Sequence, residues 1–228
     1  DVSPLLAKEP FTVELDGQTL ADIPYPAGLG SLWLARQDDQ WRIAGKPSLK
    51  NKGPHRYGAA KDELKHRFVF VYGSRGAPEE NAWSIAKARF DAETFWYRGN
   101  GSVEIVEDSA FLPSRYPDRT VVLYGNAETN SAWIGLLGSG PVQVRRGEVR
   151  VGNRYFRGDD LSTIFVQPRQ DSDVASVVAV GGSGPAGMRA AYPMSLFVSF
   201  VRYPDCLVTR PSQVGGRNSE NVAVGFFG

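Results

Sequence analysis

Two serine residues stand where an α/β hydrolase would carry its nucleophile. Ser74 follows the apolar run 68–72, and Ser183 follows the apolar run 176–180. Unbroken apolar runs of this length are typical of strands buried on both faces. A nucleophilic serine sits in the sharp turn after such a strand, within a G-x-S-x-G motif. Neither serine has that glycine spacing, so both are candidates by position alone.

A catalytic triad would also need a histidine, and the chain has two. His66 precedes the run 68–72 and is expected at the amino edge of the sheet, away from both serines. His55 lies in the irregular connection 45–58, which the sequence does not place. The sequence therefore favours a chain without a triad of its own, and the alternative is a small serine hydrolase that uses Ser74 or Ser183 with His55.

The ends of three expected strands predict where a ligand would bind. In an open parallel sheet, ligands lie beyond the carboxyl ends of the strands. Glycines there let a backbone approach a ligand closely, and helix N-termini bind anions. The expected lining residues are Ser74, Arg75, Asn81, Asn126, Asn130 and Ser183. The competing interpretation is that these small and polar residues only turn a strand into a helix.

Cofactor and metal motifs are missing from the sequence. The turn 73–76 is not G-x-G-x-x-G, and there is no phosphate-binding G-x-x-x-x-G-K-[ST]. One cysteine, Cys206, and two histidines cannot form a structural zinc site. The acidic pairs 159–160 and 171/173 could bind Ca²⁺ through oxygens, but exposed turn residues are the simpler interpretation. We therefore expect no cofactor and no metal.

The stretch 141–158 is unusually basic. Apolar and polar residues alternate in it with period two. Gly147 and Gly152-Asn153 interrupt this pattern, which predicts a small antiparallel meander. Its arginines face only Glu148 within the stretch, and they are Arg145, Arg146, Arg150, Arg154 and Arg157. Such a cluster could dock an acidic partner surface or an anionic glycan. It could equally be a solvated strand face that protects an exposed edge.

Composition limits the other classes of partner. The chain has 228 residues, of which 42% are hydrophobic and 22% charged, as in ordinary globular proteins. The net charge of +1 gives no general attraction to nucleic acid. No apolar run approaches the ~20 residues of a membrane span, and the first ten residues have no signal-peptide pattern.

Hydrophobic periodicity predicts an α/β fold with a mostly parallel sheet flanked by helices. The strand 68–72, the turn 73–76 and a helix from Pro78 to about Gly99 form the first unit. That helix has one polar stripe and a wide apolar remainder, which predicts heavy packing; the stripe is Ser84, Lys87, Asp91, Thr94 and Arg98.

Further elements complete the predicted organisation of the chain. Strands are expected at 103–106, 120–124, 163–167, 176–180, 196–201, 206–209 and 222–227, and a second helix at 127–137. Residues 1–60 form a small β-rich appendage and linker, and residues 61–228 form the α/β domain with the antiparallel insertion near 141–158.

Several long segments carry a resemblance to a known group of proteins. They include FVFVYGSRGAPEENAWSIAKARFDAETFWYRGNG, DRTVVLYGNAETNSAW and PVQVRRGEVRVGNRYFRGDDL. These resemble the C-terminal region of large bacterial proteins of the prolyl oligopeptidase-like or α/β-hydrolase type. The resemblance implies an accessory, non-catalytic α/β module of a secreted or envelope serine hydrolase, which places it in the extracellular space or periplasm. Its partner would be a hydrolase domain of the same or another chain.

A third function belongs to a different class. Trp33 and Trp41 lie in short expected strands of the appendage, and aromatic rings there could stack on sugars in a carbohydrate-binding module. Core packing is the competing use of both rings.

Overall fold

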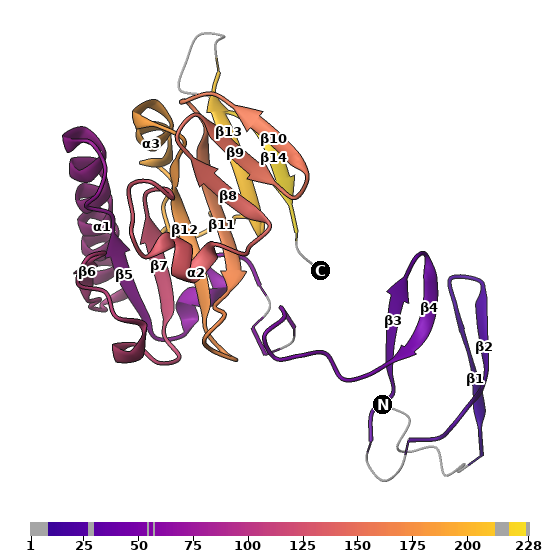
Figure 1. The fold of residues 1–228 in the computed structure, drawn as a ribbon. Helices are drawn as coiled ribbons and strands as arrows, with labels where there is room; N and C mark the ends of the chain where they lie inside the picture. The colour runs from indigo at the N-terminus through magenta and orange to yellow at the C-terminus, as the bar shows by residue number, and fades with distance from the viewer. Residues whose placement is uncertain (1–8, 27–29, 54, 57, 213–218, 227–228) are drawn as a thin grey trace. The chain divides into compact units, whose positions relative to one another are not determined.

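The computed structural model describes residues 9–26, 30–53, 55–56, 58–212 and 219–226 (Figure 1). The chain divides into two compact units, residues 1–48 and 49–228. This division falls before the predicted boundary near residue 60. The reason is that Arg56 fastens the connection to the second unit, as described below.

The first unit consists of two β-hairpins. One pairs β1 (Phe11–Leu15) with β2 (Gln18–Ile23), and the other pairs β3 (Trp33–Gln37) with β4 (Gln40–Ala44). Both turns have two central residues at positive φ, the conformation that suits the twist of a tight hairpin. The Gln18 side chain donates to the Trp41 carbonyl (2.8 Å) and accepts from the Trp41 amide (2.6 Å), which ties the hairpins together.

The second unit contains a seven-stranded sheet. From one edge to the other, its strands are β14 (Ser219–Gly225), β13 (Cys206–Pro211), β11 (Ser162–Pro168), β12 (Ser176–Gly182), β7 (Thr120–Tyr124), β5 (Phe68–Tyr72) and β6 (Ile105–Glu107). Strands β12, β7, β5 and β6 are parallel, whereas β11, β13 and β14 join through antiparallel pairs. The α/β class is confirmed, but the sheet is mixed and the expectation of a mostly parallel sheet is wrong.

The length of one connection explains the mixed sheet. Only residues 169–175 join β11 to β12. A parallel pair needs a crossover of a dozen or more residues, whereas an antiparallel pair needs only a short loop. The antiparallel direction of β11 was therefore readable from the spacing of the two apolar runs.

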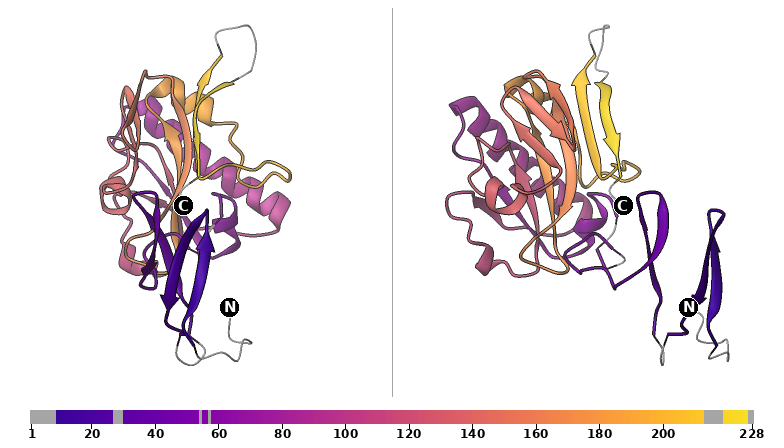
Figure 2. Two further views of the ribbon diagram at one scale, coloured as in Figure 1. Left: turned by 90° about the vertical axis from the view of Figure 1, so that its right-hand side faces the viewer. Right: turned by 45° about the vertical axis from the view of Figure 1, so that its right-hand side comes forward.

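Different layers cover the two faces of the sheet (Figure 2). Helices α1 (Pro78–Gly99) and α3 (Pro185–Ala191) lie on one face, where Ala88 and Ala191 join the core with Phe70. The other face packs against α2 (Trp133–Leu137) and against the three-stranded meander. The meander consists of β8 (Val142–Arg145), β9 (Glu148–Val151) and β10 (Arg154–Arg157), which confirms an antiparallel insertion in this stretch.

Two other expected elements differ in the structure. The second helix is shorter than 127–137, because residues 126–131 form hydrogen-bonded turns around Asn126. Residues 196–201 form no strand, and their apolar side chains include the core residue Leu196. The short 3₁₀ helices η1 (Asp62–Lys65) and η2 (Pro113–Arg115) precede β5 and β7. No described helix is long and apolar enough to cross a bilayer.

The first part of the polar stripe of α1 faces the sheet instead of solvent, whereas Arg98 at its end is exposed. Ser84, Lys87 and Asp91 are fully buried, whereas the apolar Trp96 is 67% exposed. Burial is tolerated because each polar group has partners: Lys87 Nζ lies 2.7 Å from Asp91 Oδ1, and Asp91 Oδ2 accepts from the Tyr124 hydroxyl over 3.0 Å. Hydrophobicity alone therefore predicts the wrong buried side of this helix.

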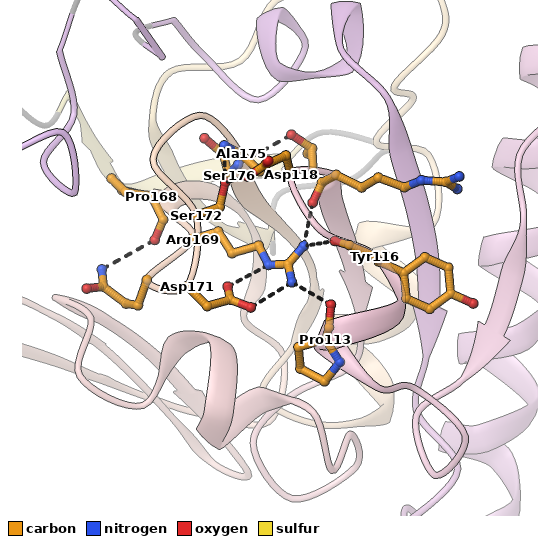
Figure 3. Close-up of polar contacts among 12 residues, drawn as sticks. Pro113, Tyr116, Asp118, Pro168, Arg169, Asp171, Ser172, Ala175 and Ser176 are labelled. Carbon is orange, nitrogen blue, oxygen red and sulfur yellow. Dashed lines mark hydrogen bonds and ion pairs between the residues drawn. The ribbon is translucent and has the colours of Figure 1, made fainter.

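Two buried arginines hold the loops at the amino ends of the parallel strands. Arg169 forms two 2.7 Å contacts with Asp171 and donates to the carbonyls of Tyr116, Arg119 and Pro113 (Figure 3). Arg56 donates to the carbonyls of Ser172 (2.7 Å) and Ala175 (2.8 Å) in the adjoining loop. These bonds fix Arg56 and the loops before β7 and β12 to one another.

Candidate functional site

The loops that follow β5, β6, β7 and β12 meet at one edge of the sheet, which we call the carboxyl rim. Ser74 and Asp108 are the first polar side chains after β5 and β6. The Ser74 hydroxyl donates to Asp108 Oδ1 over 2.6 Å, and the Ser74 amide donates to the same oxygen over 3.1 Å. The other oxygen, Oδ2, accepts from the Ser131 amide over 2.5 Å. A buried Asp108 thus joins three loops of the rim.

The loop after β5 is closed by Asn81 in the first turns of α1. Its side chain accepts from the Gly76 amide (2.8 Å) and donates to the Ser74 carbonyl (2.9 Å). Arg75 is exposed, and its amide donates to the Thr129 carbonyl over 3.0 Å. The structure therefore brings Ser74, Arg75 and Asn81 together, with the Asn81 amide directed into the loop.

Asn126 and Asn130 are both buried after β7. The Asn126 side chain donates to the Gly182 carbonyl (2.9 Å) and accepts from the amide of Thr129 (3.1 Å). Asn130 donates to the carbonyls of Val71 (3.2 Å) and Tyr124 (2.9 Å). These side-chain amides cross-link the ends of β5, β7 and β12. Asn130 fills the position between β5 and β7, where the strand order reverses.

Ser183 follows β12 and has no exposed surface. Its hydroxyl donates to the Gly158 carbonyl (2.6 Å) and accepts from the Leu161 amide (3.1 Å). The Ser183 carbonyl accepts from the Gly147 amide over 2.7 Å. Ser183 therefore connects β12 to the β8–β9 turn and to the end of β10, and it is separate from the Ser74 cluster.

The glycines of the rim are needed for contacts between protein backbones. A Cβ at Gly73 would lie 2.4 Å from the Thr129 carbonyl oxygen, and one at Gly181 would lie 1.8 Å from that of Gly125. Contacts this short are not tolerated between real atoms. The rim glycines had suggested that the backbone approaches a ligand closely. In the structure this close approach is between the backbones of neighbouring loops.

Neither histidine lies near a candidate serine. His55 is adjacent to Arg56, which binds the loop before β12, whereas Ser183 follows the other end of that strand. At about 3.3 Å per residue, the seven residues of β12 separate these ends by roughly 20 Å. His55 Nε2 also lies 2.7 Å from the Leu49 carbonyl oxygen, so this nitrogen carries a proton and is not a free base. His66 is exposed ahead of β5, at the same amino edge.

A small cavity of about 330 Å³ lies beside the rim, between the starts of α1 and α3. Glu80 lines it and is buried, with its carboxylate held by Arg146 at 3.2 and 2.6 Å and by the Ala77 amide at 2.7 Å. Burial is the largest influence on the pKa of Glu80 and raises it, but the hydrogen bonds from Arg146 and the Ala77 amide, with the charge of Arg146, together lower the pKa. The positive end of α1 is thus already neutralised by the chain's own carboxylate.

The register of the meander places its arginines on two faces. Val144, Val149 and Phe156 are cross-strand partners that pack on the core. The next row on the opposite face contains Arg150 and Tyr155. We call this opposite side the meander face; it consists of Arg145, Glu148, Arg150, Tyr155 and Arg157.

Carboxylates from outside the meander and from Glu148 within it neutralise part of its charge. Arg146 pairs with Glu80, and Arg145 lies 3.4 Å from Glu128. Arg157 lies 3.8 Å from Glu148. Among the described residues no carboxylate pairs with the other two arginines: the Arg150 Nε is buried without a hydrogen-bond partner, and the Arg154 guanidinium lies 5.1 Å from the Phe156 ring centre.

One member of each acidic pair forms an ion pair with an arginine. Asp160 binds Arg210 at 2.9 Å, and Asp171 binds Arg169. In the part of the chain that the structure describes, no three His, Cys, Asp or Glu side chains gather as a metal site would require.

Trp33 and Trp41 occupy opposite faces of their hairpin. Trp41 is paired with Arg36, and Trp33 stands three positions before Arg36, so strand alternation separates the two rings. Trp41 also donates through Nε1 to Asp16 over 3.0 Å. A single sugar-stacking platform made from both rings therefore has no support in this geometry.

Sequence reasoning missed Asp108 and the pair Glu80–Arg146. Asp108 directly follows β6, so the rule that placed Ser74 at the rim also applies to it. The sequence around Glu80 does not indicate that its side chain is buried, because its partner Arg146 lies 66 residues away. No protein-family model matches this chain, and none of the curated proteins matches it. Its function is therefore inferred from side-chain geometry and from the sequence resemblance.

Proposed function

We propose that this chain is a non-catalytic accessory α/β module that acts beside a serine hydrolase, within the same protein or on another chain. The observation that carries the proposal is that both candidate nucleophiles are engaged in hydrogen bonds within the fold. The Ser74 hydroxyl is bound to Asp108, and the Ser183 hydroxyl is bound to the Gly158 carbonyl. A catalytic serine needs a base within hydrogen-bond reach, whereas His55 belongs to the opposite edge of the sheet.

The sequence resemblance supports the association with a hydrolase. In that group of proteins the catalytic domain precedes the region that this chain resembles. A module of a secreted or envelope hydrolase would work in the extracellular space or periplasm. Loss of catalytic groups is compatible with such a role, because a binding module needs a stable surface and not an activated serine.

The meander face is the surface that we assign to docking of an acidic partner. Arg150 and Tyr155 lie side by side on it as cross-strand partners, and Tyr155 is 59% exposed. Arginine and tyrosine are enriched in protein interfaces, because both combine a large contact area with directed hydrogen bonds. Glu128 and Glu148 offset some of this charge, so we expect moderate and salt-dependent binding.

Binding to immobilised poly-L-glutamate tests this assignment. We expect retention of the full chain that falls with rising salt and falls several-fold in the double variant Arg145→Glu/Arg157→Glu, two exposed residues of the meander face. The double variant Arg98→Glu/Arg115→Glu makes the same change in net charge at exposed positions outside the meander. Equal loss in both variants, or no retention of the native chain, would reject the meander face as the docking surface. Catalytic inertness is tested separately with a fluorophosphonate serine probe.

A further inference from the structure

A broad groove of about 1240 Å³ lies on the second unit, between η1, the chain that precedes β13, and the end of β14. Pockets for drug-sized ligands usually have about 300–1,000 Å³. The groove is thus large enough for a segment of polypeptide. It has no part in the carboxyl rim or the meander face.

One wall of the groove is apolar and unusually exposed. Val224 and Phe226 stand on the same side of β14 and are 55% and 77% exposed. Phe200, in the segment before β13, also lines the groove; it is fully exposed and adopts a φ of 66°, which bulky residues rarely do. Large apolar side chains that gather in this way usually mark an interaction site.

The apolar wall arises because the sheet is covered unequally at this edge. On the opposite side of β14, Val222 and Ala223 pack against the core beneath the meander. On the groove side, Val224 is paired with Leu207 of β13, and α3 packs against the sheet as far as β13. The exposed fractions of Val224 and Phe226 show that nothing in the described chain completes the layer over them.

The other wall of the groove is basic. Its charged side chains are Lys52, Lys61, Lys65, Arg202, Asp62 and Asp205, a balance of four cations against two carboxylates. Both carboxylates are occupied, because Asp205 pairs with Lys52 and Asp62 pairs with Lys65 at 2.6 Å. Lys61 is held by backbone carbonyls, including that of Val201 at 2.7 Å, and Arg202 is exposed.

From this pairing of surfaces we infer that the groove binds a peptide segment of a partner protein in which carboxylates alternate with apolar side chains. The apolar residues would cover Phe200, Val224 and Phe226, and the carboxylates would face Lys61 and Arg202. Burial of the exposed apolar area supplies the main driving force, and the excess positive charge selects an acidic segment over a basic one. This inference does not depend on the proposed role beside a hydrolase.

The test selects random 12-residue peptides, displayed on phage, against the immobilised full chain. We expect the selected pool to be enriched several-fold in Asp and Glu and in Leu, Phe and Trp relative to the input. The dissociation constants of individual synthetic peptides are then measured by fluorescence anisotropy. Replacement of their carboxylates by amides is expected to weaken binding, because the groove would lose its charge partners.

Variants locate the binding surface. Phe200→Ser/Phe226→Ser and, separately, Arg202→Glu are expected to weaken peptide binding by about tenfold or more. The control Tyr97→Ser/Arg98→Glu makes similar changes at exposed residues of α1 and should leave binding unchanged. All substituted side chains are exposed, so circular dichroism should confirm that each variant is folded.

Other occupants give different results. Selected peptides that are basic, that bind the groove variants as tightly as the native chain, or that fail to enrich at all would overturn the inference. Self-association in sedimentation velocity that Phe200→Ser/Phe226→Ser abolishes would instead identify a second copy as the occupant. Groove-dependent binding to phosphatidylglycerol vesicles, without peptide enrichment, would identify an anionic lipid surface.

Discussion

The hydroxyl of Ser74 donates to the carboxylate of Asp108 over 2.6 Å, and this contact joins the end of β5 to the end of β6. The same carboxylate accepts two backbone amides, those of Ser74 and Ser131. Because the carboxylate is buried and has three donors, the pair holds the loops of the rim in place. A residue that looked like a nucleophile from its position is thus part of a structural tie.

Truncation of Ser74 and truncation of Asp108 should lower the free energy of unfolding by different amounts. Ser74→Ala removes one hydrogen bond to a charged group and should lower the free energy of unfolding by about 1–2 kcal/mol. Asp108→Ala leaves two backbone amides without acceptors and should cost about 3 kcal/mol or more. Urea denaturation measures both, with the exposed Ser139→Ala as a control expected within about 0.5 kcal/mol of the native chain. Equal losses for Ser74→Ala and Asp108→Ala would contradict this assignment.

Local patterns predicted the strands and the long helix well. Runs 68–72 and 120–124 are β5 and β7, and α1 begins and ends at the residues that Pro78 and Gly99 indicated. The antiparallel half of the sheet was not anticipated, although the short connection 169–175 required it. The buried side of α1 could not be predicted, because Tyr124 and the Met194 carbonyl, which complete the hydrogen bonds of Asp91 and Lys87, come from distant parts of the chain.

The buried network Lys87–Asp91–Tyr124 provides a second prediction. Lys87 also donates to the Met194 carbonyl over 2.8 Å. Burial, with the adjacent Asp91, raises the pKa of Tyr124, so its hydroxyl remains a donor. Asp91→Ala leaves a buried cation without its carboxylate and should cost about 3–5 kcal/mol in the free energy of unfolding.

A matched triple variant separates the charge effect from a simple packing defect. Lys87→Met/Asp91→Leu/Tyr124→Phe replaces the whole network with apolar groups, which removes the unpaired charge. Calorimetric melting temperatures should therefore rank the native chain and the triple variant above Asp91→Ala. If the triple variant is the least stable of the three, the unpaired cation is not the main cost.

Substitution of Arg169 should affect only the loops that its guanidinium holds. Arg169→Gln leaves the carbonyls of Pro113 and Tyr116 without their guanidinium donor. Hydrogen–deuterium exchange followed by mass spectrometry should show faster exchange in residues 109–120 and 169–176. Arg115→Gln, at an exposed position of the same loop, should leave the exchange unchanged. Uniform acceleration over the whole second unit would mean that Arg169 acts on global stability and does not hold these loops specifically.

Glu63 predicts a dependence of stability on pH. It is buried, its Oε2 has no hydrogen-bond partner, and burial raises its pKa. Because the folded state holds the Glu63 proton more tightly than the unfolded state, this proton contributes to the stability of the fold. The contribution is complete below the ordinary carboxyl pKa of about 4.3. It is lost as pH rises through the raised pKa of the folded state.

Glu63→Gln keeps an uncharged side chain at every pH. Melting temperatures should therefore show the variant to be more stable than the native chain at pH 7, by about 1 kcal/mol. Near pH 4 the difference should shrink, since the native carboxyl is then protonated. A difference that does not change with pH would show that ionisation of Glu63 has no part in stability.

The sequence indicated the location of the carboxyl rim but not the role of its side chains. Ser74, Asn126 and Asn130 lie together at the ends of β5 and β7, as the strand pattern indicated. Their hydrogen-bond partners are backbone groups and Asp108, and such pairings depend on the order of strands in space. Ser183 was grouped with them, but β7 and the loop after it lie between the ends of β12 and β5 and separate Ser183 from Ser74.

Reaction of the full chain with a fluorophosphonate serine probe tests whether the chain is non-catalytic. We expect no labelling above that of the heat-denatured chain, because neither His55 nor His66 lies near Ser74 or Ser183. A known serine hydrolase labelled in parallel verifies the probe. Labelling of the native chain that disappears in Ser74→Ala or in Ser183→Ala would show that the module is itself an enzyme.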